Sequence, residues 1–208
     1  MDASVLFAFA AACAVIALVP GPDMMFIIAT GIARGRLAGL VAALGMSSGL
    51  VVHTLAAALG LGALLAAAPV VLEAVKIAGA VFLVYLAITT MRSATDVAVR
   101  APITHGGRSL RRTYFMAVLT NLANPKVIVF YLAFFPQFLT TGGWSTPVQF
   151  LVLGAVFIAV GLTVDATAGL SAGALSVTLT RRPAVQRWLN RFSAAIFGGL
   201  AVRLVIAD

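Results

Sequence analysis

Six long apolar segments constrain this chain more than any other feature. They cover approximately residues 3–33, 37–66, 69–91, 113–139, 147–175 and 192–206. A helix of about 20 apolar residues crosses the hydrocarbon core of a bilayer, and most of these segments are longer than that. Hydrophobic residues make up 62% of the 208-residue chain and charged residues only 10%, with a mean hydropathy of +1.10. The sequence therefore predicts an all-α integral membrane protein and disfavours a soluble helical core.

The basic residues mark one side of the expected membrane. Eleven of the 14 lie in three alternate connections: Arg34 and Arg36; Arg92, Arg100, Arg108, Arg111 and Arg112; and Arg181, Arg182, Arg187 and Arg191. By the positive-inside rule these connections are cytoplasmic, which predicts that both termini lie outside. The net charge of +8 is thus explained by topology, and we expect the lipid bilayer and no nucleic acid as a partner.

The connection formed by residues 93–112 divides a single transporter domain, residues 1–208, into two halves. It is the longest connection and contains Pro102 and the Gly106-Gly107 pair, so we expect a flexible cytoplasmic linker. Residues 1–92 and 113–208 each hold three apolar segments. An odd number of spans forces the halves into opposite orientations, as in inverted-repeat transporters. The repeat is inferred from this pattern, because little residue identity relates the halves.

The first segment of each half carries a proline break. One helix over residues 3–33 would measure roughly 45 Å at about 1.5 Å per residue, well beyond a hydrocarbon core of about 30 Å. Pro20-Gly21-Pro22 interrupts it, with Gly21 as the expected N-cap of the second part. Asn124-Pro125 interrupts residues 113–139 in the same way. The predicted fold is therefore six transmembrane helices in two inverted three-helix repeats, the first helix of each repeat broken at proline.

A charge of opposite sign follows each break. Asp23 follows the first and Lys126 the second, and a charge inside the membrane costs roughly 2.5–3.5 kcal/mol on insertion scales, which marks a functional candidate. A cation is disfavoured at a helix N-terminus, so we expect Asp23 to be the partner of Lys126. The pair is either purely structural or part of a substrate site. A zwitterionic amino acid fits the second interpretation, with its ammonium at Asp23 and its carboxylate at Lys126 and the free helix N–H groups.

The breaks define the expected substrate site. Asn121 lies three residues before Asn124, on the same helix face. It is expected either to face the site or to bond the broken turn. The candidate substrate-binding residues are Pro22, Asp23, Asn121, Asn124, Pro125 and Lys126.

Three residues are candidates for proton coupling: Asp165, Asp23 and His53. The chain has no nucleotide-binding motif, so uphill transport would draw on an ion gradient. Asp165 lies in the middle of the fifth segment with no evident cation partner in the sequence, which makes it the better proton carrier; the alternative is a hydrogen-bonded helix contact. His53, near Ser47, Ser48 and Thr54, is either a proton relay or a satisfied core residue.

No motif predicts an enzyme or a cofactor. The sequence contains no nucleophile elbow, phosphate-binding loop or HExxH motif, so we expect a secondary transporter. Cys13 is the single cysteine, and a metal site would need scattered groups such as Cys13, His53 and the Met24-Met25 pair. We therefore expect no bound metal. An exporter of another small solute or of a metal ion, and a non-transporting scaffold subunit, are the alternatives.

Several motifs, spread in order along the chain, resemble one family. They are Val19-Pro20-Gly21-Pro22, Gly49-Leu50-Val51-Val52-His53, Val75-Lys76-Ile77-Ala78-Gly79-Ala80, Asn121-Leu122-Ala123-Asn124-Pro125-Lys126, Phe134-Phe135-Pro136-Gln137-Phe138 and Val164-Asp165. The chain resembles the LysE/RhtB family of bacterial lysine and homoserine/threonine exporters. The resemblance implies a six-span inner-membrane exporter of amino acids or close derivatives, driven by the proton gradient. Together with the two inverted halves, it leads us to expect proton antiport by alternating access. It adds weight to the two breaks and to Asp165, and leaves the amino acid and homo-oligomerisation open.

Overall fold

The structure is a computed structural model that describes residues 1–19, 21–61, 69–92, 109–141, 143–172 and several positions between 188 and 202. All regular structure in these residues is helical, as predicted. The elements are α1 (Ala3–Leu18), α2 (Pro22–Arg34), α3 (Arg36–Ala56), the π-helical turn η1 (Ala57–Leu61), α5 (Pro69–Arg92), α6 (Leu110–Leu122), α7 (Pro125–Val129), the π-helical turn η3 (Phe130–Phe134), the 3₁₀ turn η4 (Phe135–Phe138) and α8 (Thr146–Leu170).

Two of these helices are long and apolar enough to cross a membrane. They are α3 with most of its π-helical extension (Arg36–Gly60) and α8. Two bent pairs also pass when each is treated as one broken span: α1 with α2, bent by 56°, and α6 with Pro125–Phe138, bent by 48°. The described residues thus contain two to four candidate spans. The predicted sixth segment, residues 192–206, and linker residues 93–108 lie largely or wholly outside the described residues, so the six-span inverted repeat stays a prediction.

Both helix breaks lie where the prolines predict them. Helix α1 ends at Leu18 and α2 begins at Pro22, after an extended Gly21 with φ −141° and ψ −178°. Pro20 itself lies outside the described residues. Helix α7 begins at Pro125, and the side chain of its N-cap Asn124 accepts a hydrogen bond of 3.0 Å from the Lys126 backbone N–H. The breaks therefore place helix ends inside the bundle. At these ends the last C=O groups of one helix and the first N–H groups of the next have no partner within their own helix.

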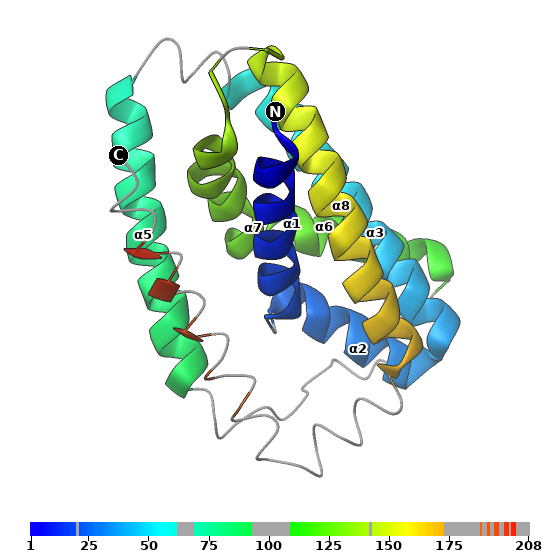
Figure 1. Cartoon of the computed structure of the whole chain (residues 1–208). Coiled ribbons are helices and arrows are strands. Elements are labelled where there is room, and N and C mark those ends of the chain that lie inside the picture. The colour runs from blue at the N-terminus through cyan, green and yellow to red at the C-terminus, as the bar shows by residue number, and fades with distance from the viewer. Residues whose placement is uncertain are drawn as a thin grey trace.

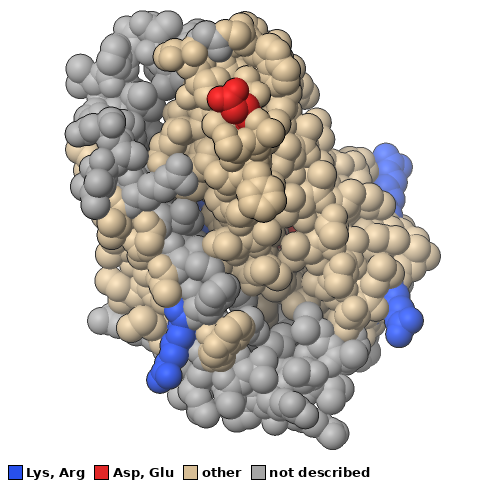
Figure 2. Space-filling view, viewed as in Figure 1, with Lys and Arg blue, Asp and Glu red and all other residues tan. Residues whose placement is uncertain are grey.

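The helices are arranged so that both breaks meet in the interior. Figure 1 shows α1 beside the upper part of α8, with α2 leading away at the lower end of the bundle and α7 at mid-height behind α1. Helix α3 returns from the α2 end and packs against both α6 and α8. The N-terminus lies at the upper end, opposite the junction between α2 and α3. Most of the described residues on the face seen in Figure 2 are uncharged, with one acidic group near the upper end and basic side chains towards the right and lower left edges, as expected of a surface that faces lipid.

Close backbone contacts join the helices at the lower end. A Cβ atom at Gly39 of α3 would lie 2.7 Å from the carbonyl oxygen of Gly169 in α8, closer than real Cβ atoms approach. A Cβ at Gly31 of α2 would lie 2.5 Å from the Cβ of Ala172. Helices α2, α3 and α8 are therefore in direct backbone contact here, which small residues permit.

Aromatic side chains fill the interior at the upper end. The rings of Phe9, Phe130 and Phe135 contact one another, with centroids 5.0 Å apart for Phe9–Phe135 and 5.6 Å for Phe130–Phe135. We call the whole group the aromatic cluster; its members are Phe9, Phe130, Tyr131, Phe134, Phe135, Phe138, Phe150 and Phe157. All of them are buried. Turns η3 and η4 carry five of these rings from α7 towards the end of the bundle that holds the N-terminus (Figure 1).

Candidate functional site

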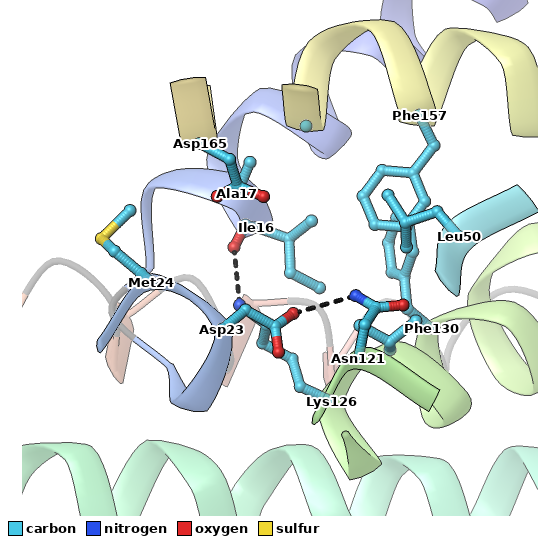
Figure 3. Close-up of a pocket in the computed structure, with 12 residues that line it drawn as sticks. Ile16, Ala17, Asp23, Met24, Leu50, Asn121, Lys126, Phe130, Phe157 and Asp165 are labelled. Carbon is cyan, nitrogen blue, oxygen red and sulfur yellow. Dashed lines mark hydrogen bonds between the residues drawn. The ribbon is translucent and has the colours of Figure 1, made fainter. Parts of the chain in front are cut away.

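A pocket lies where the two helix breaks meet (Figure 3). It is lined by residues from both broken pairs and from the two unbroken candidate spans: Ile16, Ala17, Asp23, Met24, Leu50, Asn121, Lys126, Val127, Phe130, Phe157, Gly161 and Asp165. Four of the predicted site residues are among them, namely Asp23, Asn121, Lys126 and Asp165. The fold thus brings together charged residues that are up to 142 positions apart in the sequence.

Two asparagine side chains hold the carboxylate of Asp23. Asn124 Nδ2 donates to Asp23 Oδ1 at 2.5 Å, and Asn121 Nδ2 donates to Asp23 Oδ2 at 3.2 Å. Both asparagines are only 1% exposed, and Asp23 is 8% exposed. Asp23 also lies in the first turn of α2, where the helix dipole favours a negative charge. The carboxylate is therefore stabilised by amide donors and by the N-terminus of its own helix.

The ammonium of Lys126 contacts the end of α1. Its Nζ donates to the carbonyl oxygens of Ile16 and Val19, each at 3.4 Å. These carbonyls belong to the last turn and the C-cap of α1, where the helix dipole favours a cation. Lys126 also lies against Gly21, since a Cβ atom there would be 3.1 Å from Nζ. The break in the first apolar segment thus supplies the oxygen atoms that hold Lys126.

The expected direct ion pair between Asp23 and Lys126 does not form in the described structure. Each group is bound by other partners, the carboxylate by asparagine amides and the ammonium by α1 carbonyls. The physical reason is that the second break brings two asparagine amides to Asp23, while the end of α1 offers its unpaired carbonyls to Lys126. The two charges still line one pocket, where they interact through a medium less polarisable than water.

Asp165 enters the same pocket from α8. In Figure 3 it lies across the pocket from Asn121, near Ile16 and Ala17. Among the described residues its carboxylate has no hydrogen-bond partner. No cation partner of Asp165 is evident from the sequence, whereas the structure places Lys126 in the same pocket. The lysine is therefore flanked by two carboxylates that come from different helices.

The rest of the pocket is apolar. Leu50, Phe130 and Phe157 form much of its wall (Figure 3). None of the three is a conspicuous site residue in the sequence, although Phe157 and Gly161 precede Asp165 at intervals of four and so share its helix face. The cavity has a volume of about 30 Å³, which is enough for a water molecule but not for an amino-acid side chain.

His53 lies outside this pocket. Its ring stacks on Tyr131 with the centroids 5.4 Å apart, and its buried Nε2 atom has no hydrogen-bond partner. The hydroxyls that are expected to form a relay have other partners or none. Ser48 donates to the Leu44 carbonyl, Thr54 bonds to the Leu50 carbonyl and to the Tyr131 hydroxyl, and Ser47 bonds to no described group. The structure therefore does not join His53 to Asp23 or Asp165 through these hydroxyls.

The two prolines set the geometry of the site and do not line the pocket. Pro22 and Pro125 are the first residues of α2 and α7, where a proline costs no hydrogen bond. Their place at the breaks positions Asp23 and Lys126, each the following residue. Within the described residues, no three His, Cys, Asp or Glu side chains gather as a metal site would require.

Comparison with known proteins gives one family and several relatives. The sequence profile of the "LysE type translocator" family matches residues 14–208. An uncharacterized membrane protein of Vibrio cholerae is 34% identical over 216 aligned residues, covering 100% of this chain and 99% of the relative. Proteins named leucine efflux protein from Klebsiella pneumoniae and an Enterobacter species are 30% and 29% identical, each covering 91% of this chain and 89% of the relative. No solved structure matches.

Proposed function

Because the chain belongs to the LysE-type translocator family, we propose that it exports amino acids with aliphatic side chains, or close derivatives, by proton antiport. The protein is a membrane transporter and not an enzyme. The family supports amino-acid export in general, and relatives are named for leucine. The observation that carries the choice of substrate is the pocket itself, in which two carboxylates and one ammonium are set among apolar walls.

A zwitterionic amino acid satisfies both kinds of group in this pocket. The substrate ammonium binds at Asp23, and the substrate carboxylate binds at Lys126. The two hydrogen bonds from Lys126 to α1 carbonyls are long, at 3.4 Å each, so the ammonium can turn to a carboxylate at little cost. Asp23 keeps free acceptor sites, because an ionised carboxylate offers about four and only two are used. The substrate side chain then packs against Leu50, Phe130 and Phe157.

Barriers on both sides of the pocket support alternating access. The aromatic cluster fills the bundle between the pocket and the upper end, and the contacts of Gly31 and Gly39 with α8 and its C-terminal end close the lower end. A cavity of about 30 Å³ must also enlarge before leucine can enter. We propose that the helices around the pocket separate at one barrier at a time. The protein lies in the bacterial inner membrane. The end of the bundle that holds Arg34 and Arg36 faces the cytoplasm, and both termini lie on the opposite side of the membrane.

Asp165 is the residue we assign to proton coupling. Asp23 already receives two amide hydrogen bonds, whereas the carboxylate of Asp165 receives none within the described part of the chain. A carboxylate without fixed donors can exchange a proton with less rearrangement of its surroundings. Because Asp165 and Lys126 line the same pocket, a change of charge at Asp165 is felt where the substrate carboxylate binds.

An efflux assay tests the proposed export. Cells that express the protein are fed dipeptides containing leucine, alanine, lysine or threonine, and the released amino acids are measured outside. We expect faster release of leucine than in cells with the empty vector, and little change for lysine. Release that matches the empty vector for every amino acid would contradict the proposed function and favour another solute or a scaffold role.

Proteoliposomes with an imposed pH gradient test the coupling. We expect Asp165→Asn to abolish uphill leucine transport while leucine–leucine exchange continues. The exchange reaction is the control for folding and substrate binding. Normal gradient-driven transport by this variant would exclude Asp165 and return the proton to Asp23 or His53.

A further inference from the structure

One residue of the pocket wall has no side chain. Helix α8 presents Phe157, Gly161 and Asp165 to the pocket at intervals of four residues, so they form one stripe along the helix. Phe157 contributes a ring and Asp165 a carboxylate, while Gly161 between them contributes only hydrogen. Glycine is unfavourable in a helix interior compared with alanine, so a glycine here calls for a physical reason.

Close helix packing does not supply that reason. A Cβ atom at Gly154 of the same helix would lie 2.2 Å from Thr54 Cγ2, and one at Gly169 would lie 2.7 Å from the Gly39 backbone. At Gly161 the single neighbour within 4 Å among the described residues would be Leu50 Cδ1, at 3.4 Å. That distance is ordinary van der Waals contact with the end of a flexible side chain. The backbone tolerates a side chain at Gly161, and what such a side chain would occupy is the pocket.

We propose that Gly161, together with Leu50 on the facing helix, determines the size of the substrate side chain. The inference rests on the proposed export of amino acids. With the charged end of the substrate at Asp23 and Lys126, the space between Gly161 and Leu50 receives the side chain once the pocket has enlarged. Phe157 closes this space one helical turn beyond Gly161. A side chain added at Gly161 therefore shortens the room left for the substrate, and a smaller residue at Leu50 extends it.

The test is a change in selectivity and not a loss of rate. Export of alanine, valine, leucine and phenylalanine is measured in proteoliposomes for the wild type, Gly161→Ala, Gly161→Val and Leu50→Ala. A hydrophobic pocket discriminates by about 10- to 200-fold for each methylene group that fits or does not fit. We expect the leucine-to-alanine ratio to fall at least about tenfold in Gly161→Val, and less in Gly161→Ala. We expect Leu50→Ala to raise the phenylalanine-to-leucine ratio.

Two further variants separate size from damage to the fold. Ala159→Val adds volume to α8 at an exposed position outside the pocket, and we expect it to leave all ratios unchanged. In the double variant Gly161→Ala with Leu50→Ala, we expect the leucine-to-alanine ratio to return towards that of the wild type. A general loss of folding cannot produce such a recovery. If Gly161→Val fails to fold, Gly161→Ala and the double variant decide the question.

The outcomes distinguish this inference from the proposed function. If the wild type exports leucine and both Gly161 variants keep its selectivity, Gly161 does not set substrate size, and export stands. If the Gly161 variants lose all substrates equally and the double variant does not recover selectivity, the role of Gly161 is structural and the inference is overturned. If the wild type exports none of the four amino acids, the proposed function is wrong, and the inference about Gly161, which rests on it, is overturned as well.

Discussion

Replacing Asn124 tests how the two breaks are held together. Its side-chain oxygen caps α7 by accepting from the Lys126 backbone N–H, and its Nδ2 donates to Asp23 at 2.5 Å. One residue thus links the start of α7 to the start of α2. Alanine removes both bonds, whereas serine keeps the cap and removes the bond to Asp23, which a shorter side chain does not reach.

The structure allows the cost of each change to be worked out. Loss of an N-cap side chain costs about 1 kcal/mol, with a range of about 0.5–2. Loss of a hydrogen bond to a charged group costs about 1.5–3 kcal/mol. We therefore expect Asn124→Ala to lower the free energy of unfolding by about 2–5 kcal/mol. Asn124→Ser should lose about 1 kcal/mol less, because the cap remains.

Asn121→Ala is the matched control. Asn121 is as buried as Asn124, at 1% exposed, but it makes a longer bond of 3.2 Å to Asp23 and caps no helix. Alanine at this position also suits the last turn of α6. We expect its loss of stability to be smaller than that of Asn124→Ala. Denaturant unfolding of the three variants in detergent micelles, followed by tryptophan fluorescence, gives the comparison.

The outcome that refutes this reasoning is specific. If Asn124→Ser is no more stable than Asn124→Ala, the cap makes no contribution and the account of α7 is wrong. If Asn124→Ala costs no more than Asn121→Ala, the two bonds of Asn124 do not join the breaks as described.

Two other predictions follow from the packing and the charge pattern. Gly49→Ala would place a Cβ atom 2.6 Å from Asn121 Oδ1, so we expect it to displace that side chain and to lower the free energy of unfolding by about 1–3 kcal/mol. Gly60→Ala, with no described neighbour within 4 Å of the added atom, should be nearly neutral. An equal effect of both changes would contradict this account. The linker at Gly107, outside the described residues, is predicted to lie in the cytoplasm. A reporter that is active only in the cytoplasm should therefore be active when it is fused at Gly107. Activity there of a reporter that works only outside the cell would overturn the predicted orientation.

Local patterns in the sequence were sufficient for several features of this protein. Hydropathy identified the apolar helices, because a chain of this composition satisfies its backbone in lipid only by forming helices or closed barrels. Pro22 and Pro125 located both helix starts, because proline lacks the N–H that a helix interior requires. The same local logic marked Asp23, Lys126 and Asp165, since any charge in an apolar segment is conspicuous. The number of spans and the inverted repeat stay predictions.

The partners of those charges were decided only by the tertiary structure. The sequence favoured a direct bond between Asp23 and Lys126, since opposite charges attract and no nearer partner was evident. In the folded chain Asn124 donates a hydrogen bond to Asp23, and the α1 carbonyls of Ile16 and Val19 accept hydrogen bonds from Lys126. The apolar walls, Leu50 and Gly161 among them, were equally hidden, because an apolar residue in a membrane helix looks the same whether it faces lipid or a pocket. These contacts join helices that lie about 100 residues apart in the sequence. They depend on how the helices pack in three dimensions, and no local sequence pattern specifies that packing.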